Sequence, residues 1–260
     1  MSTILNRILD VKRTELADLA NLKFEEHSPR KKRSFIEKIR EANEMKIIAE
    51  FKRASPSKGD INPNLNPQEQ AQSYEQFGAD AISVLTDSSF FKGSFADLQA
   101  VRSVVDLPIL CKDFVIDPIQ IDTAYKAGAD IVLLIAAAME KSKLIELYQY
   151  ANEKNLEVLV EIHDEEDFEK ANAANAQLMG INNRNLKTFE VNLAATEQLA
   201  PLVLQTGASL ISESGIKTVS DVIRVQSAGA RGILVGETFM MAPNLQDTFK
   251  QLKQPVRTVR

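Results

Sequence analysis

The sequence predicts an α/β protein of the (β/α)8 TIM-barrel class with an N-terminal helical extension, and three observations support this prediction. Short apolar runs alternate with stretches of helical spacing from residue 47 almost to the C-terminus. Eight such runs fall within about 210 residues, which matches the number of strand–helix units and the length of a closed parallel barrel. Several helical stretches end in a glycine just before the next run, as at Gly78, Gly128 and Gly229, where a left-handed turn can close the helix.

The predicted strands are IIAEFK (47–52), AISVLT (81–86), PILCKD (108–113), IVLLI (131–135), EVLVEI (157–162), LMGIN (178–182), SLISES (209–214) and GILVG (232–236). A doubly wound open sheet is the competing arrangement. It normally carries a turn of the form G-x-G-x-x-G after its first strand, whereas here the first run leads into KRASPSKGD. We therefore predict one barrel domain over residues 1–260.

Residues 1–45 precede the first predicted strand and form the predicted N-terminal extension. The pattern indicates one long amphipathic helix, a basic loop (SPRKKRS, 28–34) and a second helix that begins at Phe35. We interpret these segments as an extension packed on the barrel, with a flexible tail as the alternative.

Composition excludes several classes of protein. The formal net charge of −5 argues against general nucleic-acid binding. The sequence contains no run of 18 apolar residues, so a membrane span is not expected. The N-terminus lacks the form of a signal peptide, and Cys111 has no second cysteine to pair with, so a cytoplasmic location is expected. With only two histidines, His27 and His163, a dedicated zinc site is not expected, and we predict no metal and no cofactor.

Charged residues occur at the ends of the predicted strands, where barrel enzymes place their active sites. Glu50 and Lys52 end the first run and, by strand alternation, share one side with Ile48. Burying such charges costs several kcal/mol or more unless a partner or a function compensates. Lys112 ends the third run and Glu161 the fifth. Each alone is consistent with a solvated residue at the barrel mouth.

The later strands add further polar groups at the same end. Asn182 and Arg184 follow the sixth run, and Glu213 with Ser214 closes the seventh. Carboxylates and ammonium groups that meet in one apolar-walled mouth shift each other's pKa values, as acid–base catalysis requires. Together these residues predict an acid–base active site.

The seventh and eighth units also carry a pattern typical of phosphate binding. SESGI and LVGET place Gly215 and Gly236 where a strand leads into a helix, so that backbone N–H groups there can hold a phosphate. Tight turns that need glycine are the alternative explanation.

These motifs resemble the indole-3-glycerol-phosphate synthase family of tryptophan biosynthesis. The resemblance covers residues 34–250, and the motifs that carry it are IAEFK with ASPS near residue 50, LTDSSFFKGS (85–94), PILCKDFVIDPIQI (108–121), LVEIHDEED (159–167), GINNRNL (180–186), SESGI (212–216) and LVGETFM (234–240). The resemblance implies a carboxy-lyase that closes the pyrrole ring of 1-(2-carboxyphenylamino)-1-deoxyribulose 5-phosphate and releases carbon dioxide and water.

The resemblance also implies the role of each site residue. Lys112 matches the general acid, Glu161 the base, and Lys52 the lysine that contacts substrate carboxylate and phosphate. Glu50 matches a carboxylate that positions lysine and substrate, while Asn182 faces the substrate. The remaining matches are substrate-binding residues (Ser55, Pro56, Phe91, Phe114, Arg184, Leu186, Glu213, Ser214) and phosphate-binding residues (Lys52, Ser55, Gly215, Gly236 and, through its backbone, Glu237).

Three other functions remain as alternatives. Phosphoribosylanthranilate isomerase is a related barrel, but it needs a cysteine near the end of the first strand, where this chain has Glu50 and Lys52. A Schiff-base aldolase would use Lys112 as a nucleophile. A non-catalytic binding barrel is the third alternative. The only partner expected is the small phosphosugar–anthranilate substrate, without nucleic acid or membrane. The oligomeric state is open, with a monomer as one option.

Overall fold

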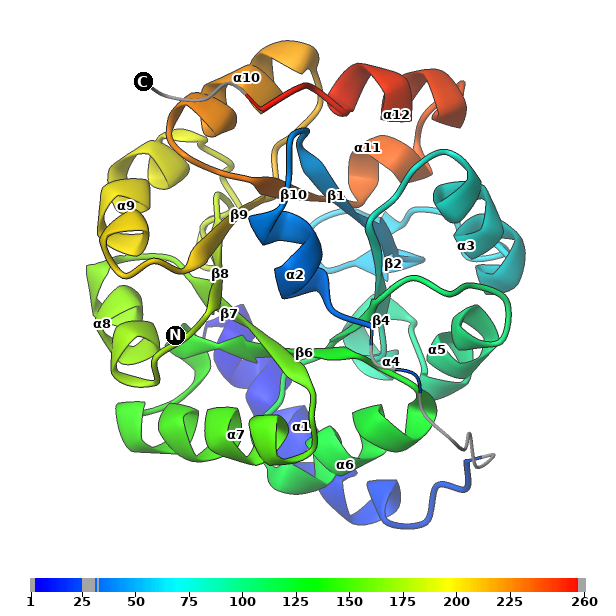
Figure 1. Cartoon of the computed structure of the whole chain (residues 1–260). Coiled ribbons are helices and arrows are strands. Elements are labelled where there is room, and N and C mark those ends of the chain that lie inside the picture. The colour runs from blue at the N-terminus through cyan, green and yellow to red at the C-terminus, as the bar shows by residue number, and fades with distance from the viewer. Residues whose placement is uncertain (1–2, 25–30, 32, 257–260) are drawn as a thin grey trace.

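The computed structural model describes residues 3–24, 31 and 33–256. Eight parallel strands in this part of the chain close into a barrel with the order β1-β10-β9-β8-β7-β6-β5-β4. The first strand pairs with the last, Ile47 opposite Ile233, and also with β4, Glu50 opposite Ser83. Figure 1 shows the ring of strands surrounded by helices. The predicted TIM barrel is therefore confirmed.

The barrel strands are β1 (Lys46–Phe51), β4 (Ala81–Leu85), β5 (Ile109–Lys112), β6 (Ile131–Ile135), β7 (Glu157–Ile162), β8 (Leu178–Asn182), β9 (Ser209–Glu213) and β10 (Gly232–Val235). Three of the predicted ranges are the observed ones, three differ by one residue at one end, and two differ by one residue at both ends. The short strands β2 (Ala54–Ser55) and β3 (Gly59–Asp60) form an antiparallel hairpin after β1 that the sequence did not predict.

The outer helices lie between the strands as the alternating pattern predicted (Figure 1). They are α3 (Pro67–Gln76), α4 (Ser88–Phe91), α5 (Phe95–Arg102), α6 (Pro118–Ala127), α7 (Lys141–Glu153), α8 (Glu165–Ala173), α9 (Ala194–Gln205), α10 (Val219–Ser227), α11 (Glu237–Met240) and α12 (Leu245–Leu252), with a 3-10 turn η1 (Ala136–Ala138) after β6. In the described residues no helix is long and apolar enough to cross a membrane.

The glycines that precede the strands adopt the predicted left-handed conformation. The φ angles are +100° at Gly78, +103° at Gly128 and +111° at Gly229. Residues with a Cβ rarely adopt such angles, so glycine lets each helix end and the chain turn directly into the next strand.

Two apolar layers form the core. Side chains on one face of the strands fill the barrel interior, among them Ile48, Leu110, Leu159 and Ile211. Side chains on the other face pack against the helices, and Cys111 is one of these, as its alternation with Lys112 predicts. The two layers arise because successive side chains of each strand point to opposite faces of the sheet.

The second helix of the N-terminal extension, α2 (Phe35–Arg40), closes the barrel at the N-terminal ends of its strands. Phe35 and Ile39 are buried in the interior core, and Figure 1 shows α2 over the centre of the ring. Glu157, the first residue of β7, caps this helix by accepting hydrogen bonds from the backbone N–H groups of Phe35 (2.9 Å) and Ile36 (3.1 Å). The extension is thus packed on the barrel, and residues 28–30 and 32 of the predicted basic loop lie outside the described residues.

The first helix, α1 (Ile4–Leu19), packs at the opposite end of the barrel through a buried ion cluster. Lys12 Nζ lies 2.9 Å from Asp87 Oδ2, 2.8 Å from Asp113 Oδ1 and 2.8 Å from Glu15 Oε2. Lys12 is only 3% exposed. Burial alone would lower its pKa, but Asp113 and Asp87 raise the pKa of Lys12 above its ordinary value. Because Asp87 and Asp113 follow β4 and β5, this contact fixes α1 at the C-terminal ends of the strands.

Replacing this buried lysine is expected to destabilise the protein strongly. Lys12→Met leaves Asp87 and Asp113 buried without their cation, which typically costs about 3–5 kcal/mol. Arg13→Met is the matched control on the same helix, because the Arg13–Asp10 pair is exposed and such pairs contribute about 1 kcal/mol or less. Urea denaturation measures both changes. Equal and small losses of stability in the two variants would contradict the anchoring role of Lys12.

Candidate active site

A layer of charged side chains lies directly above the apolar layer of the barrel interior. Two residues after Leu110 and Leu159, on the same face of their strands, come Lys112 and Glu161. Glu213 follows Ile211 in the same way on β9. The register explains their meeting, because parallel strands with aligned ends bring corresponding residues together at the C-terminal mouth.

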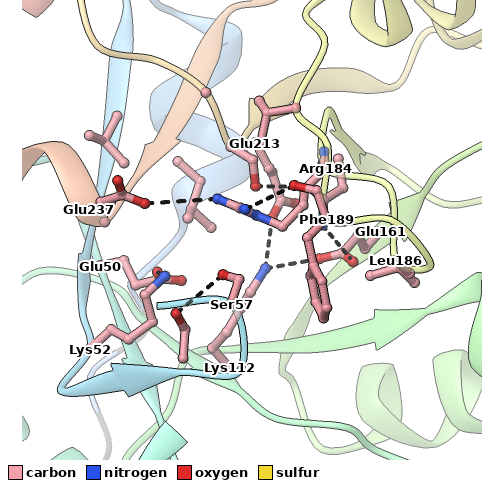
Figure 2. A pocket seen from close by; sticks show the side chains of 18 of the residues that line it. Glu50, Lys52, Ser57, Lys112, Glu161, Arg184, Leu186, Phe189, Glu213 and Glu237 are labelled. Carbon is pink, nitrogen blue, oxygen red and sulfur yellow. Dashed lines mark hydrogen bonds and ion pairs between the residues drawn. The ribbon is translucent and has the colours of Figure 1, made fainter. Parts of the chain in front are cut away.

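Lys112 is the centre of this charged layer. Its Nζ lies 2.6 Å from Glu213 Oε2 and 3.0 Å from Glu161 Oε2, and Figure 2 shows the ammonium extending toward Glu161. Burial alone would lower the pKa of Lys112, but Glu161, Glu213 and Glu50 together raise it above its ordinary value. The side chain is therefore a firmly held ammonium group, which is the protonation state that an acid needs before it donates.

The two glutamates that hold Lys112 differ in their environments. Burial favours protonation of Glu161, but Lys112, His163 and Asn182 outweigh it and hold the pKa of Glu161 below its ordinary value. Burial raises the pKa of Glu213 to about 7, against the attraction of Lys112. Glu213 Oε1 is buried and makes no hydrogen bond within the described chain. Glu161 is thus an ionised carboxylate, whereas burial shifts Glu213 toward its protonated form.

An amide on the neighbouring strand orients the Glu161 carboxylate. Asn182, the last residue of β8, donates from Nδ2 to Glu161 Oε1 over 3.1 Å. Its own Oδ1 accepts hydrogen bonds from Ser214 Oγ (2.9 Å) and from the backbone N–H of Arg184 (3.0 Å). The amide cannot rotate without losing these bonds, so the orientation of Glu161 is fixed by β8 and β9 together.

Glu50 and Lys52 form an ion pair of 2.5 Å at the end of β1, on the side of the strand that faces the pocket. A Cβ on Gly236, built on its backbone, would overlap the carboxylate of Glu50. Gly236 was predicted as a phosphate ligand. The structure gives it a second property, because the missing side chain leaves the space that Glu50 occupies.

Gly180 has the same relation to Glu213, and the sequence analysis did not single it out. A Cβ on Gly180 would overlap Glu213 Oε1 and would lie 3.3 Å from a methyl group of Leu159. The backbone of β8 therefore has to be bare at this position for Glu213 to reach Lys112.

These charged groups line a pocket of about 700 Å³ at the barrel mouth. Phe91 and Phe114 form one apolar wall, with ring centroids 5.9 Å apart. Leu186 lies on the loop after β8, and Figure 2 shows Phe189 beside it. Helix α1 adds Ile4, Leu5 and Ile8 to the lining. The pocket thus combines an aromatic wall with a charged floor.

The opposite part of the pocket is lined by the β2–β3 hairpin and the loops after β9 and β10. Gly215 has φ +84° and Ser214 φ +66°, so the loop after β9 turns through two consecutive left-handed residues. The carboxylate of Glu237 lies 3.4 Å from Lys58 Nζ and 3.9 Å from Arg184 Nη2, and Figure 2 shows Arg184 extended toward it. The prediction gave Glu237 a role only through its backbone, and these side-chain pairs add to it.

The structure brings every predicted site residue to this one pocket: Glu50, Lys52, Ser55, Pro56, Phe91, Lys112, Phe114, Glu161, Asn182, Arg184, Leu186, Glu213, Ser214, Gly215, Gly236 and Glu237. Their individual roles stay predictions. The sequence analysis missed Gly180, Lys58 and the α1 residues. One signal was available for α1, since Lys12 interrupts an apolar stripe of Leu5, Ile8 and Leu9 at helical spacing.

The fold and the site define a TIM-barrel enzyme whose mouth is equipped for acid–base catalysis. The family model for indole-3-glycerol phosphate synthase matches residues 3–252. The chain is 50% identical to the indole-3-glycerol phosphate synthase of Bacillus mycoides (strain KBAB4) over 254 residues, which covers 97% of this chain and 99% of that protein. The enzymes of the same name from Bacillus cereus (strain B4264) and Bacillus thuringiensis subsp. konkukian (strain 97-27) are each 51% identical, with the same coverage.

The chain belongs to the indole-3-glycerol phosphate synthase family. Its activity is that of a carboxy-lyase of tryptophan biosynthesis, as the motifs of the sequence predicted.

The contact between Gly180 and Glu213 gives a test of the charged layer. In Gly180→Ala the methyl group displaces Glu213 Oε1, which is the end of a flexible side chain, so the fold should persist while the Lys112–Glu213 pair is disturbed. Turnover should fall at least about tenfold, because the Lys112 ammonium is then no longer held in place. Loss of such a donor from an active site costs up to about 3–4 kcal/mol.

Gly207→Ala is the control for this substitution. Gly207 has open space around it and φ +78°, so the added methyl should lower stability by about 1 kcal/mol and leave turnover unchanged. Steady-state kinetics and thermal melting of both variants check the prediction. Unchanged turnover in Gly180→Ala would show that the position of Glu213 is not important for the reaction.

Proposed function

We propose that this enzyme converts 1-(2-carboxyphenylamino)-1-deoxyribulose 5-phosphate to indole-3-glycerol phosphate, with Lys112 as general acid and Glu161 as general base. The observation that carries the proposal is the ammonium of Lys112 between two buried carboxylates in the mouth of the barrel. An acid and a base in direct contact can each be restored by the other between successive steps.

The first step is closure of the five-membered ring. The aromatic carbon that bears the carboxylate attacks the ketone carbon, and Lys112 donates a proton to the ketone oxygen. The attack makes the ring cationic, and nearby carboxylates stabilise that charge. Besides Glu161, Glu213 and Glu50 lie within electrostatic reach of Lys112, which supports this role.

Loss of carbon dioxide and loss of water complete the reaction. Departure of CO2 returns its bonding electrons to the ring and removes the cationic charge. Dehydration then needs a proton donor for the leaving hydroxyl and a base for a carbon-bound proton. Lys112 and Glu161 fill these roles, because Asn182 keeps one oxygen of Glu161 oriented while the other contacts Lys112.

The pocket holds the two ends of the substrate in different ways. Phe91, Phe114 and Leu186 would contact the anthranilate ring on the aromatic side. On the other side, Ser55, Gly215, Gly236 and the backbone of Glu237 would hold the phosphate, with Lys52 between substrate carboxylate and phosphate. Pro56, Arg184, Glu213 and Ser214 complete the substrate contacts.

The protonation state of Lys112 argues against the aldolase alternative. A Schiff-base lysine must lose its proton to act as a nucleophile, and enzymes achieve this by lowering its pKa. The pKa of Lys112 is instead raised by the surrounding glutamates. Borohydride in the presence of a ketose phosphate should therefore trap no adduct.

The direct experiment mixes the protein with 1-(2-carboxyphenylamino)-1-deoxyribulose 5-phosphate and follows indole fluorescence. A fluorescent product with one CO2 released per molecule supports the proposal. Substrate that stays unchanged, or a product without an indole ring, overturns it.

Lys112→Arg is expected to reduce turnover at least about a hundredfold, the lower range for loss of general acid catalysis. Arginine keeps a positive charge between Glu161 and Glu213, but its guanidinium does not release a proton in proteins. The Michaelis constant should change much less, because phosphate and ring contacts fix most of the binding. Lys112→Met is the companion variant, and it should also lose stability because it leaves two buried carboxylates unpaired. Turnover of Lys112→Arg within about threefold of the parent would contradict the assignment.

Full activity is expected to survive exhaustive chelation. Ammonium and carboxylate groups suffice for the proposed steps, and no cluster of three or more His, Cys, Asp or Glu side chains suited to a metal occurs in the described chain. Activity is measured before and after dialysis against EDTA. A large loss that one divalent cation restores would refute the prediction.

A further inference from the structure

His163 lies between the active-site pocket and a second pocket. It follows β7 directly, two residues after Glu161, and is largely buried. Glu161 lines the first pocket, whereas His163 and Asp167 line the second, which has a volume of about 680 Å³ and also borders Asn182 and Arg184. The imidazole ring therefore contacts Glu161 from the side of the second pocket.

The contacts of the ring place it between two carboxylates. Nδ1 lies 3.3 Å from Asp167 Oδ2, which also accepts a hydrogen bond from the backbone N–H of His163. Nε2 lies 3.4 Å from Glu161 Oε1 and, within the described residues, it is buried without a hydrogen bond. A carboxylate only accepts, so Nδ1 must carry a proton toward Asp167. A second proton on Nε2 would be directed at Glu161.

The proposed reaction consumes one proton in each turnover. The ketone oxygen takes one proton during ring closure, and the departing hydroxyl takes a second to leave as water. One proton is returned when the base removes hydrogen from carbon. The substrate carboxylate leaves as neutral CO2 with the C–C bonding electrons retained by the ring. Two protons are supplied and one is recovered, so one must enter the site from solvent.

We propose that His163 is a positioning residue that delivers this proton from the second pocket through Glu161 to Lys112. Asp167 holds the ring so that Nε2 faces Glu161 Oε1, and Glu161 Oε2 is 3.0 Å from Lys112 Nζ. The proton passes from Nε2 to Glu161 Oε1, and a half-turn of the protonated carboxyl group then brings it to the neutral amine that Lys112 becomes after donation. The neutral ring, which keeps its proton on Nδ1, then takes a new proton on Nε2 when a turn of the ring exposes that nitrogen to solvent in the second pocket. The inference rests on the proposed roles of Lys112 and Glu161.

The surrounding charges favour a protonated ring. The charged groups around the ring come from several elements: Glu161 on β7, Asp167 and Lys170 on α8, Glu213 on β9 and Arg184 after β8. Asp164, Glu166, Lys187 and Glu190 also line the second pocket. Burial alone would lower the pKa of His163, but Asp167, Glu161 and Glu213 raise it above its ordinary value. Proton delivery is therefore complete at pH values below the ordinary pKa of histidine and declines as pH rises through the raised pKa.

The test compares His163→Asn with the parent enzyme and with Lys170→Gln. Asparagine can still hydrogen-bond in the second pocket but carries no proton, and Lys170→Gln removes a charge from the same pocket without contact to Glu161. Stopped-flow mixing with 1-(2-carboxyphenylamino)-1-deoxyribulose 5-phosphate follows indole fluorescence, and a pH indicator follows proton uptake. Both are recorded before the released CO2 is hydrated, because hydration returns a proton to the solution. Steady-state kcat is measured across pH with and without added imidazole.

For His163→Asn, kcat should fall about tenfold, less than the roughly hundredfold expected for loss of the general acid itself. KM should stay near the parent value. Its proton uptake should lag behind the parent's, the alkaline decline of the kcat profile should disappear, and imidazole should restore part of kcat. Lys170→Gln should resemble the parent.

Two results would overturn the proposal: a kcat of His163→Asn within about twofold of the parent, or a loss of kcat that keeps the parent's pH profile and is not restored by imidazole. The second result would assign His163 a merely structural role. A parent enzyme that forms no indole product would instead refute the proposed function, so the two failures are distinguishable.

Discussion

The buried ion cluster of Lys112, Glu161 and Glu213 is the constraint on which the rest of the site depends. Removing these charges from water costs several kcal/mol for each ion, and only close pairing offsets that cost. The barrel achieves the pairing with three different strands, β5, β7 and β9, so the charges meet only if the register of the whole sheet is correct. Stability and catalytic geometry are therefore determined by the same strand alignment.

The bare backbone at Gly180 is a consequence of that cluster, and Gly236 has the same relation to Glu50 beside it. Each glycine lies on a strand, or at its end, beside a glutamate that needs the space of a Cβ. A glycine within a strand normally weakens it, because it adds chain entropy and no side-chain packing. Here the lost packing is replaced by room for Glu213 and Glu50. Asn182 also serves the cluster, because its hydrogen bond fixes the orientation of the Glu161 carboxylate.

The sequence predicted the barrel and the charged residues at its mouth because both depend on local periodicity. Strand alternation placed Lys112 on the face of Leu110 and Glu161 on the face of Leu159. Their positions at the ends of the strands placed them at the mouth of the barrel. Local periodicity does not predict which distant segments of the chain contact each other. The amphipathic pattern of α1 shows that one face is buried but does not identify Asp87 and Asp113 as its partners, nor the end of the barrel on which it packs. The role of Gly180 depends on the length and direction of a side chain on the next strand, which no local pattern records.

The pairing of β1 with β10 has a consequence for the order in which the protein matures during synthesis. Glu50 and Lys52 leave the ribosome early, but the edge of β1 that pairs with β10 stays open until residues 232–235 have been made. The space for the Glu50 carboxylate likewise depends on Gly236, which comes near the end of the chain. Contacts of such large sequence separation form slowly and leave strand edges exposed while the chain is incomplete. A nascent chain therefore carries Glu50 and Lys52 for most of translation without a barrel to hold them. Premature termination before β10 yields a product with an open sheet edge rather than a smaller working enzyme.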